Sequence, residues 1–304
     1  MSYTPIMWHG VKQLSFLGDA EQAIRLYQPV LTAIENQKGV LDVDTVKGCT
    51  LGMRARPDGG CYGECYANKI AQRYGIDFTV SVSRKLTPAT RLEVFRTVKN
   101  YPASWYRIGT AGEPCHDWDN TVEVCEYLSD ARKTPVIITK HWIPLSDDHI
   151  ARLRSIGAVF NTSVSGFDSD AQIKHRVAQI ERLKAAGIRS IARVVTAQYG
   201  SSEWAIAAKK KQDYLMTLEP VIDNPLRAEK SNPHVLNGDI VLTRREDAVG
   251  GGKLVSLHRE DAYLGTCDAC PDQCGVEQSR GNYVFGHGDM FGYRDVQRSD
   301  RALS

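Results

Sequence analysis

Between about residue 66 and about residue 219, segments whose apolar residues recur every three to four positions alternate with short runs rich in β-branched residues. The first pattern predicts helices and the second predicts strands, and their alternation indicates parallel strands joined by crossover helices. The predicted strands are Phe78–Val82, Trp105–Ile108, Pro135–Thr139, Ala158–Val164, Ser190–Thr196 and Tyr214–Leu218. The predicted helices are Tyr66–Tyr74, Pro88–Val98, Thr121–Arg132, Asp147–Ile156, Asp170–Ala186 and Ser202–Lys211.

The number of these units sets the expected fold class. Six β/α units predict an α/β protein with a partial (β/α)6 barrel of parallel strands, rather than a closed eightfold barrel. The helix that begins at Asp170 is the clearest, because its apolar residues keep helical spacing and Gly187 follows it as a stop signal. In such a sheet the loops that leave the carboxyl ends of the strands build the functional site.

The flanking segments are less regular than the predicted barrel, which covers residues 46–220. Residues 1–45 carry one amphipathic helix, about Asp19–Glu35, and are interpreted as an N-terminal extension. Residues 221–304 are rich in Asn, Pro and Gly, with three glycines at 250–252. They are expected to form an irregular, cysteine-rich C-terminal region that closes over the mouth of the barrel.

Composition limits the class of protein. The chain has 304 residues, 42% hydrophobic and 24% charged, which is typical of a soluble globular protein and argues against wholesale disorder. No apolar run approaches the roughly 18 to 20 residues that a spanning helix needs, and the first ten residues lack the features of a secretory signal, so no membrane association and a cytoplasmic location are expected. With 38 basic and 36 acidic residues, any nucleic-acid partner must be held by a local patch.

Eight cysteines form the most informative feature of the sequence. In a chain without a secretory signal they are expected to be buried residues, metal ligands or catalysts rather than disulfides. Six fall into two groups whose neighbours are Gly, Pro, Asp and Arg, which are residues of turns rather than of cores. The first group is Cys49, Cys61 and Cys65, and the second is Cys267, Cys270 and Cys274.

The first group precedes a predicted helix and ends in the sequence CYAN. Three thiolates on one loop suit a cubane iron–sulfur cluster whose fourth iron is left open for a chelating substrate, whereas structural zinc requires four ligands. A second signal, GTAGEP, lies at the end of the second predicted strand. Gly112 permits a close backbone approach there, and the carboxylate of Glu113 can accept a hydrogen bond from an ammonium group, although an ordinary strand-to-helix turn has the same sequence character.

Together the two signals resemble the radical S-adenosylmethionine superfamily, in particular a divergent, phage-borne branch with a GCYxxCYA-like ending. The resemblance covers residues 45–220 and implies a 4Fe–4S cluster on Cys49, Cys61 and Cys65 whose open iron takes the amine and carboxylate of S-adenosylmethionine. It also implies that Gly112 and Glu113 bind the amine of this cofactor. The chain departs from the usual Cys-x3-Cys-x2-Cys spacing, because here the spacing is Cys-x11-Cys-x3-Cys. If Cys49 is not a ligand, Cys115 is the obvious replacement.

Polar residues at the ends of later strands are further candidates for binding the cofactor. Asn161, Ser163 and Ser165 follow from the fourth predicted strand, and small polar residues there bind the ribose or the methionyl carboxylate in the proteins that the chain resembles. Arg193 on the fifth strand can meet a carboxylate or a phosphate, as can the Lys140–His141 pair. For each of these residues a satisfied strand-end polar group is an equally good interpretation, and His141 is equally well a core histidine.

The second cysteine group has Asp, Pro and Gly between its thiols. Cys267, Cys270 and Cys274 indicate either an auxiliary iron–sulfur cluster or a zinc ion completed by a histidine such as His258 or His287. A purely structural role, in which this group ties the C-terminal region onto the barrel, is also open.

The sequence leaves three functions open. The first, implied by the resemblance, is a radical enzyme that takes electrons from an external donor and acts on a nucleobase, specifically an isomerase that remodels a glycine adduct of thymidine during hypermodification of phage DNA; its location is then the host cytoplasm. The second is a thymine-lesion lyase that resembles spore photoproduct lyase. The third is a zinc- or cluster-containing nucleic-acid-binding module without catalysis. Aromatic residues and glycines in GNYVFGHGDMFGYRD, residues 281–295, are expected to stack an extruded base.

Overall fold

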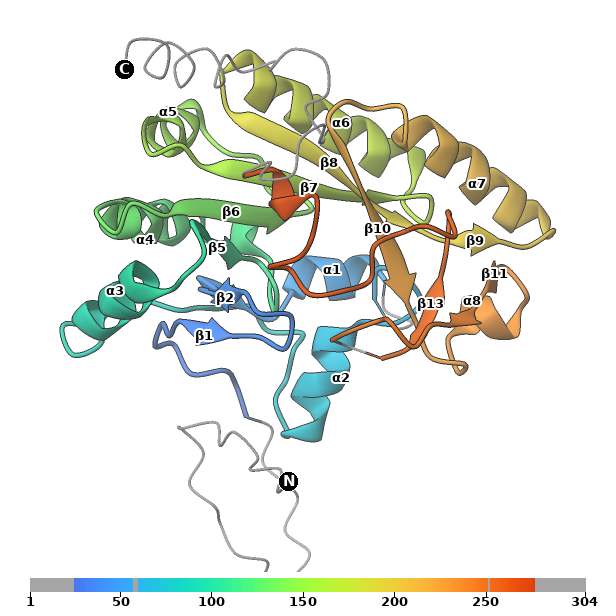
Figure 1. Ribbon diagram of the computed structural model, residues 1–304, viewed down its shortest axis with the longest axis horizontal. Coiled ribbons are helices and arrows are strands. Elements are labelled where there is room, and N and C mark those ends of the chain that lie inside the picture. The colour runs from blue at the N-terminus through green and yellow to red at the C-terminus, as the bar shows by residue number, and fades with distance from the viewer. Residues whose placement is uncertain (1–24, 57–59, 251, 277–304) are drawn as a thin grey trace, which may run out of the picture.

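A nine-stranded, mostly parallel sheet forms the centre of the molecule (Figure 1). The computed structural model describes residues 25–56, 60–250 and 252–276. The strand order is β1-β2-β5-β6-β7-β8-β10-β13-β12, and the six strands from β2 to β10 run parallel. These six are β2 Leu41–Asp42, β5 Trp105–Ile108, β6 Thr134–Thr139, β7 Val159–Ser165, β8 Arg189–Thr196 and β10 Val221–Arg227.

Antiparallel strands lie at both ends of the sheet and in two small sheets. At the ends, β1 pairs with β2, while β13 pairs with both β10 and β12. The small sheets pair β3 with β4 and β9 with β11. These strands are β1 Ile34–Glu35, β3 Val46–Lys47, β4 Val82–Ser83, β9 Gln198–Tyr199, β11 Ile240–Val241, β12 Thr243–Arg244 and β13 Leu254–Ser256.

Helices α3 to α7 lie along one side of the strands (Figure 1). Because the six parallel strands are neighbours in chain order, right-handed crossovers place their connecting helices on the same face of the sheet. In Figure 1, α3 to α7 form an arc outside the strands, and the red segment that includes η2 lies inside this arc. The helices are α1 Thr50–Ala55, α2 Tyr66–Arg73, α3 Arg91–Asn100, α4 Trp118–Ser129, α5 Asp147–Ser155, α6 Asp170–Ala185, α7 Glu203–Leu215 and α8 Pro233–Leu236, with short 3-10 turns η1 Pro114–His116 and η2 Gln273–Gly275.

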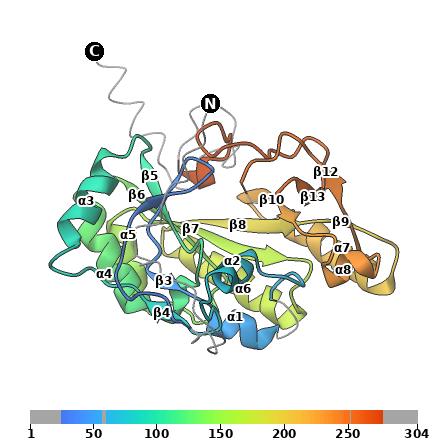
Figure 2. The same cartoon turned by 90° about the horizontal axis from the view of Figure 1, so that it is seen from below.

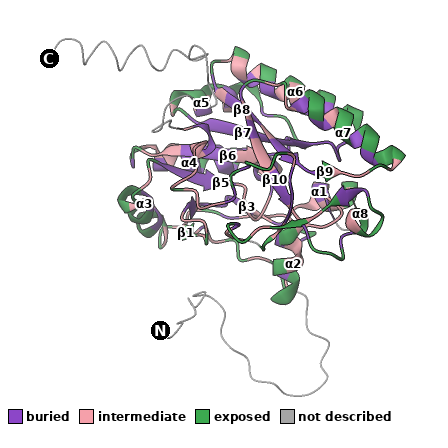
Figure 3. Ribbon diagram, turned by 45° about the vertical axis from the view of Figure 1, so that its right-hand side comes forward, coloured by how far each residue is buried: buried purple, intermediate pink, exposed green. Residues whose placement is uncertain are grey.

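Both faces of the central strands are buried, as Figure 3 shows in purple. Every residue of β7 is buried, and its side chains alternate between two cores. Phe160 packs into the large core between the sheet and the helices, whereas Val159 packs on the inner side with Ile191 and Cys274. A strand covered on both faces is therefore built from a nearly continuous run of buried residues, which is typical of a parallel sheet.

Local sequence signals set the helix boundaries. Ser146 and Ser169 each cap a helix in a complete capping box, at the start of α5 and of α6. Gly187 has a φ of +79° just after α6, a conformation that glycine adopts without strain. The six predicted helices are therefore confirmed with shifts of a few residues at their ends, as are the four predicted strands from Trp105 to Thr196.

Two predicted strands are wrong. The segment Phe78–Val82 does not enter the main sheet, where the first parallel strand is β2; only Val82 of that segment forms a strand, in β4. The segment Tyr214–Leu218 is instead the end of α7 and the turn after it. Leu215 is fully buried and Tyr214 is 50% exposed, which is the pattern of an amphipathic helix, and the sixth parallel strand starts after Pro220.

The predicted N-terminal helix is also wrong where the structure describes it. Asp19 and the residues up to 24 lie outside the described residues, while residues 25–35 contain no helix. Arg25 and Val30 form isolated parallel bridges with Ile76 and Lys85, and β1 follows. The large sheet thus extends beyond residues 46–220 at both ends, through β1 and β2 and through β10, β12 and β13.

Two structural expectations are settled only at a coarse level. The α/β class and the large, mostly parallel sheet are confirmed, but β1 and β12 end the sheet without pairing with each other among the described residues, so a closed barrel is not formed there. Within the same ranges, no helix has the length and apolar character required to span a bilayer.

Candidate functional site

A backbone bridge joins the first cysteine loop to the GEP segment that follows β5. Gly48 pairs with Gly112 in parallel fashion, and the Gly48 N–H donates to the Ala111 carbonyl at 3.2 Å. A Cβ atom on Gly112 would lie 2.1 Å from the carbonyl oxygen of Val46, and one on Gly48 would lie 2.2 Å from that of Val80. Both positions therefore require glycine. The sequence predicts that a ligand or backbone comes close to Gly112, and in the structure the backbone at Val46 does so.

Cys49, Cys61 and Cys65 are half-buried and come from one loop beside this bridge. Cys49 immediately precedes α1 and Cys65 immediately precedes α2, with Cys61 in the turn between them. A Cβ on Gly52 would lie 2.6 Å from the Cys49 Sγ and 3.8 Å from the Cys61 Sγ, so these two sulfurs border the same small space. At Gly60, a Cβ would lie 2.8 Å from the Cβ of Cys65, so that cysteine also requires a glycine beside it.

Burial and neighbouring negative charges favour the neutral form of these thiols. Burial raises the pKa of Cys49, and Glu113 and Cys61 raise it further by charge repulsion. Burial also raises the pKa of Cys65, while the N–H groups of Asn68 and Ala67 at the start of α2 act in the opposite direction. The three sulfurs thus lie close enough to raise one another's pKa values, and forming thiolates here requires an opposing positive charge such as that of an iron–sulfur cluster.

The arrangement does not fit a single metal ion. Across the described ranges, no set of three or more His, Cys, Asp or Glu side chains is grouped closely enough to hold one ion. Because a cubane cluster separates its ligand sulfurs more widely than one ion does, three thiols spread around a loop remain compatible with a 4Fe–4S cluster.

Glu113 is buried at the end of β5, where three groups of the chain donate to its carboxylate. These are the Thr139 hydroxyl, the backbone N–H of Lys140 at 2.9 Å and that of Cys115 at 3.4 Å. Burial raises the pKa of Glu113, and the donated hydrogen bonds oppose this effect. Glu113 thus fixes the loops that follow β5 and β6, in the immediate surroundings of Cys49.

The polar residues of β7 contact both cysteine groups. Ser163 shares a hydrogen bond of 3.2 Å with the hydroxyl of Tyr62, which follows Cys61. Asn161 instead donates to the carbonyl of Cys274 at 3.0 Å. Ser165, at the end of the strand, is fully buried; its backbone N–H donates to Asp168 at 2.9 Å, and within the described residues its hydroxyl has no partner.

Arg193 lies on β8 opposite Ser163, but its side chain extends toward the second cysteine group. Its Nη2 donates to the Asn224 side chain at 2.9 Å, and its Nη1 lies 3.8 Å from the Cys274 Sγ. The structure therefore brings Ser163 to the first cysteine loop and brings Asn161 and Arg193 to the second.

The second cysteine segment covers the inner face of the sheet. Cys274 is buried there with Val159 and Ile191, and the backbone N–H of Cys267 donates to the Lys38 carbonyl at 2.8 Å. Burial raises the pKa of Cys270 to about 11 and raises that of Cys267, where nearby Arg107 is the strongest opposing charge.

Of the two histidines considered as zinc ligands, only His258 is described, and it bonds outside this segment. His258 bonds through its Nδ1 to the Gln212 amide at 3.0 Å, and His287 lies outside the described residues. The described contacts hold Cys267 and Cys274 against the inner face of the sheet and its first strands without involving a histidine.

A buried ion group beside Cys61 contains Lys140, which is a candidate from the sequence, and Asp168 and Arg176, which are not. Asp168 lies 2.6 Å from the Nη1 of Arg176 and 3.6 Å from the Nζ of Lys140, and this Nζ lies 4.8 Å from the centre of the Tyr62 ring. Burial raises the pKa of Cys61, and Lys140 is the strongest opposing influence. Asp168 follows the end of β7, so its position after a strand is a signal that could have found it. Arg176 lies within α6, where the sequence alone indicates a solvated residue.

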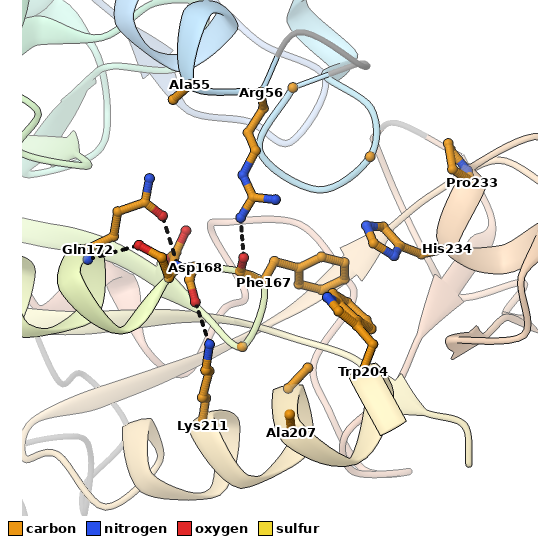
Figure 4. Close-up of a pocket in the computed structure, with 15 residues that line it drawn as sticks. Ala55, Arg56, Phe167, Asp168, Gln172, Trp204, Ala207, Lys211, Pro233 and His234 are labelled. Carbon is orange, nitrogen blue, oxygen red and sulfur yellow. Dashed lines mark hydrogen bonds between the residues drawn. The ribbon is translucent and has the colours of Figure 1, made fainter. Parts of the chain in front are cut away.

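A cavity of about 710 Å³ opens next to this ion group (Figure 4). It lies between the first cysteine loop, the β7–α6 loop, α7 and the start of α8. Its size is within the range of about 300 to 1,000 Å³ for small-molecule sites. The polar, charged and aromatic side chains that line it include Arg56, Phe167, Gln172, Trp204, Lys211 and His234.

Comparison with protein-family models and with curated proteins gives no match to this chain. The class of protein therefore follows from fold and site: a mixed α/β protein with a large, mostly parallel sheet, whose cysteine loop lies at the carboxyl ends of the strands beside Glu113, Lys140 and Asp168.

Proposed function

We propose that this protein is a radical S-adenosylmethionine enzyme built on a partial (β/α)6 barrel. One observation carries the proposal: the Gly48–Gly112 bridge places the three-cysteine loop directly beside the buried Glu113 at the end of β5. The sequential order of the six parallel strands supports the barrel, since a doubly wound sheet reverses its strand order in the middle.

The residues of this loop have distinct roles in the proposal. Cys49, Cys61 and Cys65 hold three irons of a 4Fe–4S cluster, and Gly112 and Glu113 position the methionyl amine of S-adenosylmethionine. When bound, the cluster and this cofactor, with an external electron donor, supply a 5′-deoxyadenosyl radical that abstracts hydrogen from an unactivated carbon. The buried Lys140 and Asp168 hold the Cys61 side of the loop in place and keep water out.

For the residues on β7 and β8 the geometry favours unequal roles. Ser163 and Ser165 lie on the face of β7 that meets the first cysteine loop, so they are suited to bind the ribose or carboxylate of the cofactor. Asn161 and Arg193 are engaged by the Cys274 segment, and we assign them to that segment instead. If the segment carries a metal, an auxiliary iron–sulfur cluster or zinc are the two candidates.

The substrate that we propose is a thymine base in DNA. The specific reaction is isomerisation of a glycine adduct of thymidine, and the cavity with aromatic side chains beside the cysteine loop supports a planar substrate there. A thymine-lesion lyase uses the same site and differs in whether the cofactor is recycled. A nucleic-acid-binding module with zinc alone is the third candidate, and it differs from both enzymes in its metal content and in the absence of cofactor cleavage.

The test is anaerobic purification with assay of iron, sulfide and cofactor cleavage. We expect about four irons for the first site, absorption near 400 nm, and 5′-deoxyadenosine when dithionite and S-adenosylmethionine are added. The Cys61→Ala/Cys65→Ala variant is expected to lose the iron and the cleavage, whereas Cys125→Ala, which removes a buried thiol from α4, keeps both. A colourless, iron-free protein, or one with tetrahedral zinc alone, refutes the proposal.

Assays with modified thymidine DNA separate the two reactions. Stoichiometric 5′-deoxyadenosine indicates that the cofactor is consumed, and a substoichiometric amount indicates that it is recycled.

A further inference from the structure

Aromatic rings gather on one side of the cavity. Trp204 and His234 stack with ring centres 4.3 Å apart and planes 19° apart, and Phe167 meets both edge-on, at 5.3 Å and 5.1 Å. Trp204 keeps 36% of its surface exposed although it takes part in this group. Figure 4 shows the three rings together, opposite Gln172 and Asp168. A flat, partly open aromatic surface of this kind suits the face of a planar ring.

Cationic groups lie beside these rings. The Nη2 of Arg56 donates to the Phe167 carbonyl, and across the described ranges its guanidinium forms no ion pair. Lys211 donates to the Asp168 carbonyl at 3.1 Å and pairs with Asp170 at 2.9 Å. The carboxylate of Asp168 is already matched by Arg176 at 2.6 Å. Among the described residues, Arg56 therefore brings a positive charge without an ion-pair partner into the cavity, which suits a phosphate.

One amide faces the rings from the other side. The Oε1 of Gln172 accepts from the Ser169 N–H at 2.9 Å, within the capping box of α6. Its Nε2 has no partner among the residues that the structure describes, and it remains available to donate to a carbonyl oxygen. Thymine carries two such oxygens on its ring.

We propose that this cavity binds a pyrimidine nucleotide. The base lies against Trp204, a base carbonyl accepts from Gln172, and the phosphate lies at Arg56 and Lys211. The inference deepens the proposed function, because it gives the thymine substrate a place beside the loop of Cys49, Cys61 and Cys65. It moves base stacking from residues 281–295, which lie outside the described residues, to Trp204.

Alternative occupants fit less well. An apolar ligand leaves the Arg56 guanidinium without a counter-charge in a partly enclosed site, which is unfavourable. A simple anion such as free phosphate meets Arg56 but leaves the aromatic surface unused. A nucleotide satisfies both halves of the cavity, whether it is free or belongs to a DNA strand.

The experiment measures binding by the anaerobically purified full chain. The probe is a fluorescein-labelled oligothymidylate of twelve residues, followed by anisotropy, with thymidine 5′-monophosphate as competitor. We expect Trp204→Ala to weaken binding about tenfold, because stacking contributes about 1 to 3 kcal/mol per base and 1.4 kcal/mol corresponds to tenfold. Trp204→Phe keeps an aromatic ring and is expected to fall between that variant and the wild type. Tyr214→Ala, at a more exposed aromatic residue of α7, is expected to bind as the wild type does.

The cationic half has its own pair of variants. Arg56→Gln is expected to weaken binding about tenfold and to reduce by about one the number of counterions released on binding, measured from the salt dependence of the affinity. The control is Lys210→Gln, at an exposed lysine next to Lys211, and it is expected to change the affinity and its salt dependence much less. If thymidine 5′-monophosphate displaces the labelled oligothymidylate at a concentration similar to that of unlabelled oligothymidylate, the ligand is a free nucleotide. If much more of the mononucleotide is needed, the ligand is a DNA strand.

Unchanged affinity in both Trp204→Ala and Arg56→Gln overturns the inference, as does equal weakening by Tyr214→Ala. This failure is distinguishable from failure of the proposed function. An iron-free preparation whose binding still depends on Trp204 refutes the radical enzyme and keeps the nucleotide site. A preparation that contains iron and cleaves the cofactor, but whose two variants bind as the wild type does, refutes the nucleotide site and keeps the radical enzyme.

Discussion

The side-chain amide of Asn161 donates a hydrogen bond of 3.0 Å to the backbone carbonyl of Cys274. Two residues further along the same face of β7, Ser163 meets Tyr62 of the first cysteine loop at 3.2 Å. Two residues span about 6 to 7 Å of a strand, so one strand anchors both cysteine segments within that distance. Two segments separated by some 200 residues in sequence therefore contact neighbouring positions on one strand.

Asn161→Ala tests this anchor. The change leaves the Cys274 carbonyl buried without its donor, and we expect the free energy of unfolding to fall by about 1 to 3 kcal/mol. Asn237→Ala, at an exposed residue that ends α8, is the matched control and is expected to change stability by less than about 0.5 kcal/mol. Urea unfolding measures both. Equal stability of the two variants would show that the Cys274 segment does not depend on Asn161.

Gly112→Ala tests the contact between the GEP segment and the cysteine loop. The new methyl group would lie 2.1 Å from the Val46 oxygen, so backbone must move, and we expect a loss of about 3 kcal/mol in unfolding free energy. The control is Gly75→Asn, where φ is +65° and a Cβ meets nothing within 4 Å. Asparagine tolerates that conformation, so the control is expected to cost less than about 1 kcal/mol. A neutral Gly112→Ala would mean that the bridge to Gly48 is loose.

How far the sequence predicts this fold depends on how strongly each segment is patterned. Strand β7 and helix α6 are found within a residue or two, because a run of apolar residues and a complete capping box are both local signals. The first strand is missed because β2 has only two residues, and the acidic Asp42 and Asp44 interrupt its apolar pattern. Those two carboxylates are used by tertiary partners, Arg107 and the N–H groups of residues 109–111.

The candidate site shows the same division. The spacing of the cysteines and glycines is visible in sequence, so Cys49, Cys61, Cys65 and Gly112 are named without a structure. Arg176 and Trp204 are not, since each lies on a helix whose other residues predict only an exposed or packed face. Their roles depend on which face of each helix lies toward the carboxyl ends of the strands. The packing of the helices on the sheet determines that face, and the local sequence does not.

The buried ion group beside Cys61 makes an asymmetric prediction. Burial raises the pKa of Asp168, but Lys140 and Arg176 outweigh it, and the net pKa lies below its usual value. Asp168→Asn leaves two buried cations without their counter-charge, and we expect a loss of about 3 to 5 kcal/mol in unfolding free energy. Lys140→Met is expected to cost much less, because Arg176 still matches the carboxylate at 2.6 Å.

The matched control for this group is an exposed pair on α7. Asp213→Asn removes the partner of Lys209, a pair with side chains about half exposed, and is expected to cost no more than about 1 kcal/mol. Thermal or urea unfolding of the three variants gives the ranking. If Lys140→Met proves as costly as Asp168→Asn, Lys140 rather than Arg176 is the main counter-charge.

His141 provides a pH-dependent test of the core. Its ring is fully buried, stacks on Phe160 and shares a hydrogen bond of 3.1 Å with Thr162. Burial lowers its pKa from 6.5 to about 3, with the charges of His175, Arg176 and Arg182 acting in the same direction. These three come from α6, which packs over the loop after β6.

The sign of the effect follows from the lowered pKa. As pH falls below about 6.5 the unfolded chain binds a proton at His141 that the folded protein does not bind until about pH 3, so stability is lost over this interval. Between pH 7.5 and 5.0 the loss is about 2 kcal/mol from this residue. His141→Asn does not titrate and suits the φ of 49° at this position, so it is expected to be less stable at neutral pH but to lose less stability on acidification. Urea unfolding across the interval measures the difference in slope, and parallel slopes for the variant and the wild type would show that His141 is not kept neutral by burial.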